Sequence, residues 1–354
     1  MSKSRFLWLA VIFAAVSCGC SIDISTQQSQ PPAIENGTPS GWKNLDLTGR
    51  LIYTSSKFDI TQGISLASSI QTLDLASGEI TTIYKAPPGA WIDSEAVSPD
   101  YKQLIISYKP PADPPFSGQQ QALYRLPLDG SREPELLFTI SSNGDRYFQP
   151  EWSSDGAYVY FVHISDHKPG TYAIARVIYP DGKLEDVVED AHWPRISNDG
   201  SRLAYVSPVT GVNMLFVANA DGTNARQVPL SGPYIPTVID APLFLADDQS
   251  IFFSAPVAEQ FFAPGWADRI FGITVASADG VIPSDWWSVP VAGGNPKRLT
   301  HLESLALFAS FSPDKKHIAS YSADGIFVMN SDGSEVTRVV DHTGGLNGSI
   351  SWIP

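Results

Sequence analysis

The residues best suited to bind a metal ion are two histidines, His163 and His167, which lie close together in one segment. Imidazole nitrogens are common zinc ligands, but a zinc site needs at least three protein ligands. The nearest further candidate in the predicted topology is His192, and the spacing of the three histidines matches no strong metal-binding signature. We therefore expect solvated loop histidines at these positions and no metal site.

Nucleophilic catalysis also lacks its usual sequence pattern. The serine of GISLA, residues 63–67, is not followed by the last glycine of a G-x-S-x-G turn, and no helix pattern comes after it. The chain has no P-loop or dinucleotide-binding glycine pattern, and its two cysteines, Cys18 and Cys20, lie near the N-terminus. These observations predict no catalytic residues and no cofactor, and they favour a binding protein over an enzyme.

Aromatic and arginine side chains, which supply contact area and directed hydrogen bonds in binding sites, recur in several short segments. The best candidates for a ligand or partner face are Arg146 with Tyr147 and Trp193 with Arg195. Equivalent segments contain Trp91, Asp93, Glu95, Gln149, His192, Tyr234, Asp240, Phe308 and Asn347. Each of these side chains could instead pack within its own part of the fold, and the sequence leaves both roles open.

Three further candidates for the partner face, Phe261, Phe262 and Trp266, lie in the long segment 257–284. Large aromatic side chains are costly to leave in water, and long loops in compact domains are commonly functional. The segment is expected to cover a binding site, to contact a partner, or to pack on its own sheet. A shorter proline-rich insertion, 110–119, occurs at the equivalent place in another repeat.

The elements that must position these residues are short strands arranged in repeats. The clearest copy, FSPDKKHIASYSADGIFVMNSDGSEVTRVV at residues 311–340, reads as four antiparallel strands joined by Ser-Pro-Asp, Asp-Gly and Asp-Gly turns. Similar second, third and fourth strands recur in six copies, at spacings of roughly 40–65 residues. One sheet of this kind cannot bury both of its apolar faces, so the copies must pack on one another.

The first strand of the repeat distinguishes a closed ring from an open array. It precedes an acidic turn in five copies, at 98–100, 153–155, 197–199, 246–248 and 312–314. The first copy has no such strand, whereas one strand, in residues 348–354, is left over at the C-terminus. If this last strand completes the first sheet, the ring closes and no sheet edge stays open at the junction. The sequence therefore predicts an all-β fold, a closed six-bladed β-propeller of four-stranded antiparallel blades, over residues 46–354.

Two of the repeats carry a specific family resemblance. SPDKKHIASYSADGIFVMNSDGSEVTRVV, residues 312–340, and SNDGSRLAYVSPVTGVNMLFVANADGTNARQV, residues 197–228, resemble the WD-like PD repeat of TolB-type propellers. The resemblance covers residues 49–354 and implies a propeller of the kind found in periplasmic binding scaffolds. Similar propellers accompany prolyl-oligopeptidase-type hydrolases, but no α/β-hydrolase pattern occurs in this sequence. The alternative to a scaffold is a lyase or hydrolase with a polar site at the mouth of the central channel.

The N-terminal residues resemble a bacterial lipoprotein signal peptide, which we place at residues 1–17. Two basic residues, Lys3 and Arg5, precede an apolar run at 6–16, which is shorter than the roughly 20 residues of a membrane span. We expect cleavage before Cys18 and lipid attachment to its thiol, with Cys20 as the alternative and an ordinary secretory signal as the other interpretation. Residues 18–45, rich in Ser, Gln and Pro, are expected to form a flexible tether.

The charge of the chain argues against a nucleic-acid partner. The formal net charge is −14, and the sequence contains no basic run. A hydrophobic content of 43%, with 11% aromatic residues, is sufficient to form cores between blades. We therefore expect a lipid-anchored extracytoplasmic scaffold that binds a protein or cell-envelope component through the face bearing the insertions 110–119 and 257–284.

Overall fold

The structure, a computed structural model, describes residues 46–59, 64–111, 121–140, 144–167, 172–180, 182–236, 238–256, 283–305, 307–341 and 348–354. The chain divides into two compact units, Met1–Gly37 and Thr38–Pro354, and every described residue belongs to the second unit. These residues form strands, turns and irregular segments, and no helix long and apolar enough to cross a membrane occurs among them.

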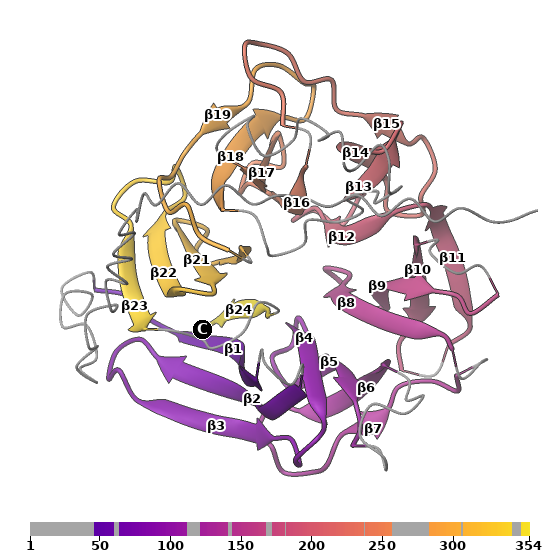
Figure 1. Cartoon of the computed structure of the whole chain (residues 1–354), viewed down its shortest axis with the longest axis vertical. Helices are drawn as coiled ribbons and strands as arrows, with labels where there is room; N and C mark the ends of the chain where they lie inside the picture. The colour runs from indigo at the N-terminus through magenta and orange to yellow at the C-terminus, as the bar shows by residue number, and fades with distance from the viewer. Residues whose placement is uncertain are drawn as a thin grey trace, which may run out of the picture. The chain divides into compact units, whose positions relative to one another are not determined.

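The second unit consists of six four-stranded antiparallel sheets, which are the blades of a propeller (Figure 1). In each blade the innermost strand is named first. Blade 1 contains β24 (Ile350–Ile353), β1 (Arg50–Asp59), β2 (Ile64–Asp74) and β3 (Ile80–Lys85). Blade 2 contains β4 (Trp91–Val97), β5 (Gln103–Lys109), β6 (Ala122–Pro127) and β7 (Glu135–Leu136). Blade 3 contains β8 (Arg146–Trp152), β9 (Tyr158–Ile164), β10 (Tyr172–Ile178) and β11 (Leu184–Glu189).

The remaining three blades follow the same order. Blade 4 contains β12 (His192–Ile196), β13 (Arg202–Val209), β14 (Val212–Asn219) and β15 (Arg226–Gln227). Blade 5 contains β16 (Asp240–Phe244), β17 (Ser250–Pro256), β18 (Ser284–Pro290) and β19 (Lys297–Arg298). Blade 6 contains β20 (Phe308–Phe311), β21 (His317–Ser322), β22 (Gly325–Asn330) and β23 (Thr337–Asp341). The predicted six-bladed propeller is confirmed.

The C-terminal strand closes the ring as the sequence predicted. β24 pairs antiparallel with β1, in a register that places Ile353 opposite Arg50 and Trp352 opposite Leu51. The indole Nε1 of Trp352 donates a hydrogen bond to the Thr48 carbonyl at 3.0 Å. Blade 1 is therefore built from both ends of the propeller sequence, and its innermost strand comes from the last residues of the chain.

The hydrophobic cores lie between neighbouring blades, since each sheet buries both faces. One core joins residues of blades 4, 5 and 6 and contains Phe252, Trp286 and Ile318. The ring of Trp286 stacks on Phe252 with centroids 4.4 Å apart, and its Nε1 donates to the Ser320 hydroxyl of blade 6 at 2.8 Å. The blades also meet closely at the Asp-Gly turns. A Cβ added at Gly333, which has a φ of 84°, would lie 2.6 Å from the Leu299 Cβ of the adjacent blade.

A repeated acidic turn joins the first and second strands of the blades. In blade 2 the Ser98 hydroxyl donates to Asp100 at 2.7 Å, and Ser153, Ser197 and Ser312 make the same contact in their own blades. The carboxylate then accepts backbone N–H groups two residues further on, as Asp100 does from Lys102. These bonds give partners to backbone N–H groups that a tight turn would otherwise leave without any.

The predicted position of this turn in blade 5 was wrong by one residue. We expected Ala246, Asp247 and Asp248 in the three turn positions, but Leu245 occupies the serine position. The N–H of Leu245 donates to the Ser250 carbonyl at 2.8 Å, just as the N–H of Ser98 donates to the Gln103 carbonyl. Asp247 is thus the turn carboxylate of blade 5 and accepts the N–H of Gln249 at 2.8 Å. The error arose because Leu245 breaks the serine pattern and two aspartates follow it.

The residue after the turn carboxylate adopts a left-handed backbone conformation in five blades. Glycine fills this place in blades 3 and 4, as Gly156 and Gly200. The other three blades carry side chains there: Tyr101, Asp248 and Lys315, with φ values of 57°, 54° and 61°. A non-glycine residue in this conformation costs on the order of 1 kcal/mol. Asp248 accepts hydrogen bonds from the N–H groups of Asn198 and Asp199 in blade 4, whereas Tyr101 and Lys315 line the central cavity.

Candidate functional site

The innermost strands of all six blades surround a central cavity of about 620 Å³. Figure 1 shows β4, β8, β12, β16 and β24 nearest the centre of the ring. The charged side chains on its wall are Asp93, Glu95, Arg146, Glu151, Arg195 and Lys315. Its size is typical of small-molecule sites, but its charged lining is more polar than usual. The geometry of these groups therefore decides what the cavity can bind.

Glu95 on β4 is an acid held in its neutral form. Its side chain is 4% exposed, and burial raises the pKa of Glu95 to about 8, with a smaller contribution from the charge of Glu151. The hydroxyl of Ser351 donates to both carboxyl oxygens, at 3.1 and 3.3 Å, and the N–H of Glu95 donates to the Ser349 hydroxyl at 2.7 Å. The Ser351 and Ser349 side chains and the Arg195 charge lower the pKa of Glu95 and so oppose the effect of burial. Glu95 is thus tied to the strand that closes the ring.

Glu151 on β8 forms an ion pair with Arg195 on β12. The Nη1 of Arg195 lies 2.9 Å from Glu151 Oε2, and the N–H of Ile196 donates to Glu151 Oε1 at 3.3 Å. Burial raises the pKa of Glu151, while Arg195, the Ile196 N–H and Lys315 oppose that shift. Glu95, Glu151 and Arg195 act on one another electrostatically, so they form one charged cluster inside the ring.

Lys315 belongs to the same cluster but comes from a turn. It occupies the left-handed position of the blade 6 turn, lines the cavity, and opposes the rise in the pKa of Glu151. Burial lowers the pKa of Lys315, and the charges of Glu151 and Asp248 oppose that shift. Its Nζ lies 5.5 Å from the centre of the Phe311 ring. Sequence analysis did not select Glu151 or Lys315. The available signal for Lys315 was a lysine at the place where the turns of blades 3 and 4 carry glycine.

The predicted pair Arg146 and Tyr147 is divided between two environments. Arg146 is exposed and lines the cavity, whereas Tyr147 is 1% exposed and does not line it. The Tyr147 ring stacks on His163 with centroids 4.7 Å apart, and its hydroxyl donates to Asp145 at 3.2 Å. Arg146 and Phe148 line the cavity and Tyr147 between them does not, as alternation at the start of β8 requires. Tyr147 supports the wall from behind, which corrects its assignment to the partner face.

The predicted pair Trp193 and Arg195 does reach the cavity. Both residues line it, together with Pro194 between them, and the pairing of β12 with β13 is irregular between His192 and Arg195. Trp193 is only 4% exposed, and its Nε1 donates to Asp240 at 3.2 Å. Its ring lies 5.3 Å from that of Phe308, so side chains of blades 4 and 6 meet although blade 5 lies between them in the sequence. Trp193 therefore narrows the channel and offers a small aromatic surface.

The histidines are placed differently from the prediction. His163 and His192 lie within β9 and β12 and are largely buried, and only His167 is an exposed loop residue. Burial lowers the pKa of His192 to about 4, and its Nε2 has no hydrogen-bond partner in the described part of the chain. Within that part, no group of three His, Cys, Asp or Glu side chains is arranged to hold a metal ion.

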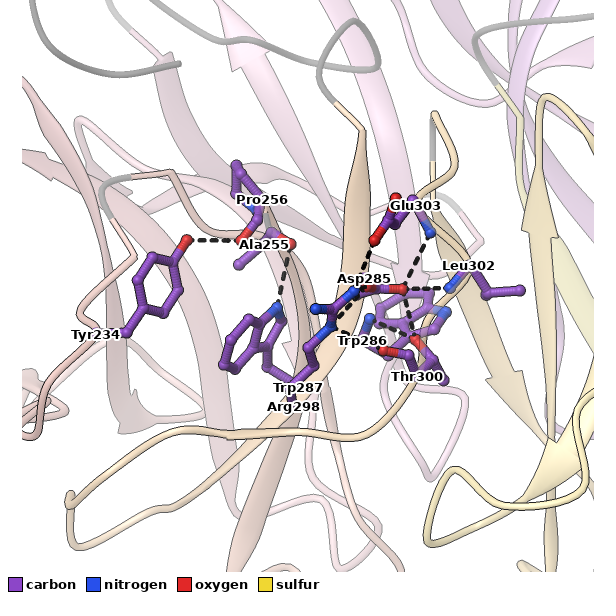
Figure 2. Close-up of polar contacts among 10 residues, drawn as sticks. All are labelled: Tyr234, Ala255, Pro256, Asp285, Trp286, Trp287, Arg298, Thr300, Leu302 and Glu303. Carbon is purple, nitrogen blue, oxygen red and sulfur yellow. Dashed lines mark hydrogen bonds and ion pairs between the residues drawn. The ribbon is translucent and has the colours of Figure 1, made fainter. Parts of the chain in front are cut away.

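The base of the blade 5 insertion is rigidly built, although Phe261, Phe262 and Trp266 lie outside the described residues. Asp285, which is fully buried, accepts hydrogen bonds from the Thr300 hydroxyl at 3.0 Å and from the N–H groups of Leu302 and Glu303 (Figure 2). It also forms an ion pair with Arg298. The insertion comprises 257–283, because Ser284 is already the first residue of β18.

The strand before the insertion, β17, is held in place by two aromatic residues. The Trp287 Nε1 donates to the Ala255 carbonyl at 3.2 Å, and the Tyr234 hydroxyl donates to the Pro256 carbonyl at 2.6 Å (Figure 2). The two rings stack with centroids 5.1 Å apart. Both ends of the insertion thus leave from fixed points. Tyr234, one of the candidate binding residues of the sequence analysis, therefore supports the end of β17.

No protein-family model matches the chain, and no curated protein matches it either. Solved structures share its fold. A TolB-type protein from Agrobacterium tumefaciens matches with a TM-score of 0.55 and 17% identity, over 87% of this chain and 99% of that chain. TolB from Acinetobacter baumannii matches with a TM-score of 0.58 and 17% identity, over 86% of this chain and 67% of that chain. A chain of a nidogen/laminin complex matches with a TM-score of 0.56 and 11% identity, over 86% of this chain and 97% of that chain. The fold is a TolB-like propeller.

Proposed function

We propose that this protein is a binding scaffold of the cell envelope: an extracytoplasmic, lipid-anchored propeller that recognises a protein or envelope component. The face that carries the loops between second and third strands is the proposed contact surface. The observation that carries the proposal is the central cavity, with the exposed Arg146, the partly buried Arg195 and the buried Trp193 on its wall. Arginine and tryptophan are enriched among the residues that dominate binding energies.

Two further observations support the scaffold. The fixed ends of the blade 5 insertion would present Phe261, Phe262 and Trp266, which remain candidates for the contact surface. Propellers of the same fold include two TolB structures and a chain from a structure named for the complex of nidogen with laminin, so this fold occurs within a protein–protein complex. The identity of the partner is left to experiment.

Replacing Arg146 by alanine is expected to weaken partner capture about tenfold, because an exposed arginine supplies several directed hydrogen bonds. The full chain, its Arg146→Ala variant and a variant lacking 257–283 would each be used to isolate partners from solubilised envelopes after crosslinking. Arg132→Ala is the matched control, since Arg132 is also exposed but lies in the turn between β6 and β7. Equal capture by all four proteins would contradict the proposed contact surface.

The proposed lipid anchor makes a separate prediction about Cys18. Changing Cys18 to serine removes the thiol that would carry the lipid, so the protein is expected to move from the membrane fraction to the soluble fraction. The measurement is immunoblotting of fractionated cells, with Cys20→Ser as the control that should stay with the membrane. Release by Cys20→Ser alone would assign the anchor to Cys20, and release by neither would exclude both thiols as anchors.

A second candidate function, an extracytoplasmic lyase or hydrolase, is favoured by one observation. Glu95 is a carboxylic acid that stays protonated near neutral pH, as a general acid must, and it lies in the cavity with the carboxylate Glu151. An activity lost in a folded Glu95→Gln variant would support the enzyme over the scaffold. If the variant keeps an activity that the wild-type protein shows, Glu95 has no role in that reaction.

A further inference from the structure

The innermost strands of blades 3, 4 and 5 share one irregularity, a β-bulge. In each strand two residues oppose a single residue of the second strand, at 149–150, 193–194 and 241–242. The first residue of each bulge has a left-handed backbone: Gln149, Trp193 and Ala241, with φ values of 52°, 58° and 47°. A bulge redirects side chains along a strand, so consecutive residues of blades 3 and 4, including Gln149 and Trp193, line the cavity.

Hydrogen bonds join these bulges across the blades. The Oε1 of Gln149 accepts the N–H of Trp193 at 3.0 Å, and the Nε1 of Trp193 donates to Asp240 at 3.2 Å. The N–H of Gln149 donates to the Ser94 hydroxyl of blade 2, also at 3.2 Å. A continuous chain of polar contacts therefore runs through blades 2 to 5. Residues with side chains rarely adopt a left-handed backbone, and such strained positions concentrate at ligand-binding sites.

Gln149 has hydrogen-bond donors to offer to a ligand. Its side chain lines the cavity and is half-buried. Because Oε1 is engaged by the N–H of Trp193, the amide is fixed with its Nε2 still available. In the described part of the chain, the Nε2 of Gln149 has no hydrogen-bond partner. The two N–H groups of this amide are donors without a structural role.

Phe308 supplies an aromatic surface in the same part of the wall. It lines the cavity and is half-buried, at the start of the innermost strand of blade 6. Its ring lies 5.3 Å from that of Trp193 and 5.9 Å from that of Tyr321, which meets it edge-on. Gln149 and Phe308 both contact Trp193, so a polar amide and an aromatic ring lie on either side of one fixed residue.

The charged residues of the wall give no preference for an anion or a cation. Three are acidic and three are basic: Asp93, Glu95, Glu151, Arg146, Arg195 and Lys315. A purely apolar ligand would leave these groups without partners in a confined space. A hydroxyl group both donates and accepts hydrogen bonds, so a neutral ligand with several hydroxyls is served by acidic and basic side chains alike. A sugar ring has such hydroxyls on its rim and apolar C–H groups on its faces.

We propose that the central cavity binds a neutral hexose unit. A face of the sugar ring packs on Phe308, and its hydroxyl oxygens accept hydrogen bonds from the Nε2 of Gln149. This inference rests on the proposed function and deepens it, since it names the class of envelope component that the cavity recognises. The same chemistry is presented by a free hexose and by the end of an envelope glycan, and the first test separates these two sources.

The first test measures binding of glucose, galactose and mannose to the full chain in detergent. Saturation-transfer NMR detects the bound sugar directly, so the general stabilisation that sugars exert as excluded osmolytes does not interfere. We expect saturable binding of at least one hexose. The matching alditol, such as sorbitol for glucose, has the hydroxyls but no ring and should bind at least tenfold more weakly, about the loss of one good contact. Tighter binding of the matching trisaccharide would support a glycan end, and equal affinity would support a free hexose.

The second test uses variants of the two residues in the proposed site. Gln149→Glu keeps the oxygen that accepts the Trp193 N–H but lacks the Nε2 donors, and it should weaken hexose binding about tenfold. Gln149→Gly should cause the same loss, and glycine adopts the left-handed backbone without strain. Phe308→Ala removes the aromatic surface, and we again expect a loss of about tenfold.

Each variant has a matched control outside the cavity. Gln227→Glu changes an exposed glutamine of the outermost strand β15. Phe216→Ala removes a half-buried ring of β14 that stacks on Tyr205 at 5.5 Å and does not line the cavity. Both controls should bind the hexose as the wild type does. Thermal unfolding without sugar checks the fold of every variant, and Gln149→Gly keeps the test decisive if Phe308→Ala fails to fold.

Four outcomes would overturn the proposal. They are no saturable binding of any of the three hexoses, unchanged affinity in the Gln149 and Phe308 variants, an alditol that binds as tightly as its hexose, and a uronate that binds more tightly than its neutral hexose. The last result would show a site for a charged ligand. Partner capture without hexose binding would refute the sugar site and leave the scaffold. Hexose binding with equal partner capture by all envelope variants would do the reverse.

Discussion

Removal of residues 349–354 is expected to abolish cooperative folding of the propeller. The deletion removes β24 and with it three nearly buried side chains, Ile350, Trp352 and Ile353, which are 4%, 6% and 1% exposed. At about 2 kcal/mol for each, their loss costs roughly 6 kcal/mol, which is comparable to the whole stability of a typical domain. It also leaves the edge of β1 without a partner and exposes it to pairing with other chains.

The measurement is chemical unfolding followed by circular dichroism, together with light scattering to detect aggregates. Leu136→Ala is a suitable control, because Leu136 lies on the outermost strand of blade 2 and is 42% exposed. This variant should unfold within about 0.5 kcal/mol of the wild type. A truncated protein that still unfolds in one sharp transition at a similar midpoint would show that ring closure contributes little to stability.

Replacing Glu95 by glutamine is expected to stabilise the protein at alkaline pH, by on the order of 4 kcal/mol at pH 8 and above. Glutamine keeps the size of the side chain and an oxygen that can accept the Ser351 hydroxyl. It removes the free energy needed to bury a group that is ionised in the unfolded chain. The magnitude follows from a pKa of about 8 in the folded state, compared with 4.5 for the unperturbed group, at about 1.4 kcal/mol per unit.

The sign of this effect depends on which state binds the proton. Below about pH 4.5 the carboxyl group is protonated in both states, so the wild type and the variant should have similar stabilities. Between pH 4.5 and 8 the folded state keeps the proton while the unfolded state loses it, so wild-type stability falls as the pH rises. Above pH 8 both states are ionised and the difference stays constant.

The test compares the unfolding free energies of the two proteins at pH 5, 7 and 9. Glu79→Gln is the control for a change of charge alone, because Glu79 is exposed and its side chain forms no ion pair within the described residues. A difference between wild type and Glu95→Gln that does not change with pH would mean that Glu95 titrates as an ordinary exposed carboxyl group.

Much of the fold follows from local sequence rules. The acidic turns and the Asp-Gly hairpins mark where strands end, and the unpaired strand at the C-terminus indicates ring closure. The offset in blade 5 shows the limit of this reasoning, since Leu245 makes the same backbone bond as the turn serines without sharing their side chain. Hydrogen bonds between backbone groups define the turn, and a side-chain pattern reports them only indirectly.

The candidate site was less predictable because it depends on which residues meet across blades. Arg146 and Arg195 were identified by residue type, but their neighbour Tyr147 was misplaced because alternation along the strand was not applied to the pair. Glu95 lay among the residues of the correct segments, yet nothing local indicates that it is protonated. Its pKa depends on burial, on serines more than 250 positions away in the chain, and on charges from blades 3 and 4.

The left-handed turn position gives the propeller a simple route to new specificities. Repeated blades arise by duplication of one unit, so the same backbone geometry is presented several times around the ring. At this position a single codon change can exchange glycine for tyrosine, aspartate or lysine, and the blade core is not disturbed. Two of the five positions, Tyr101 and Lys315, line the central cavity, so substitutions there would change the charge of its wall one blade at a time.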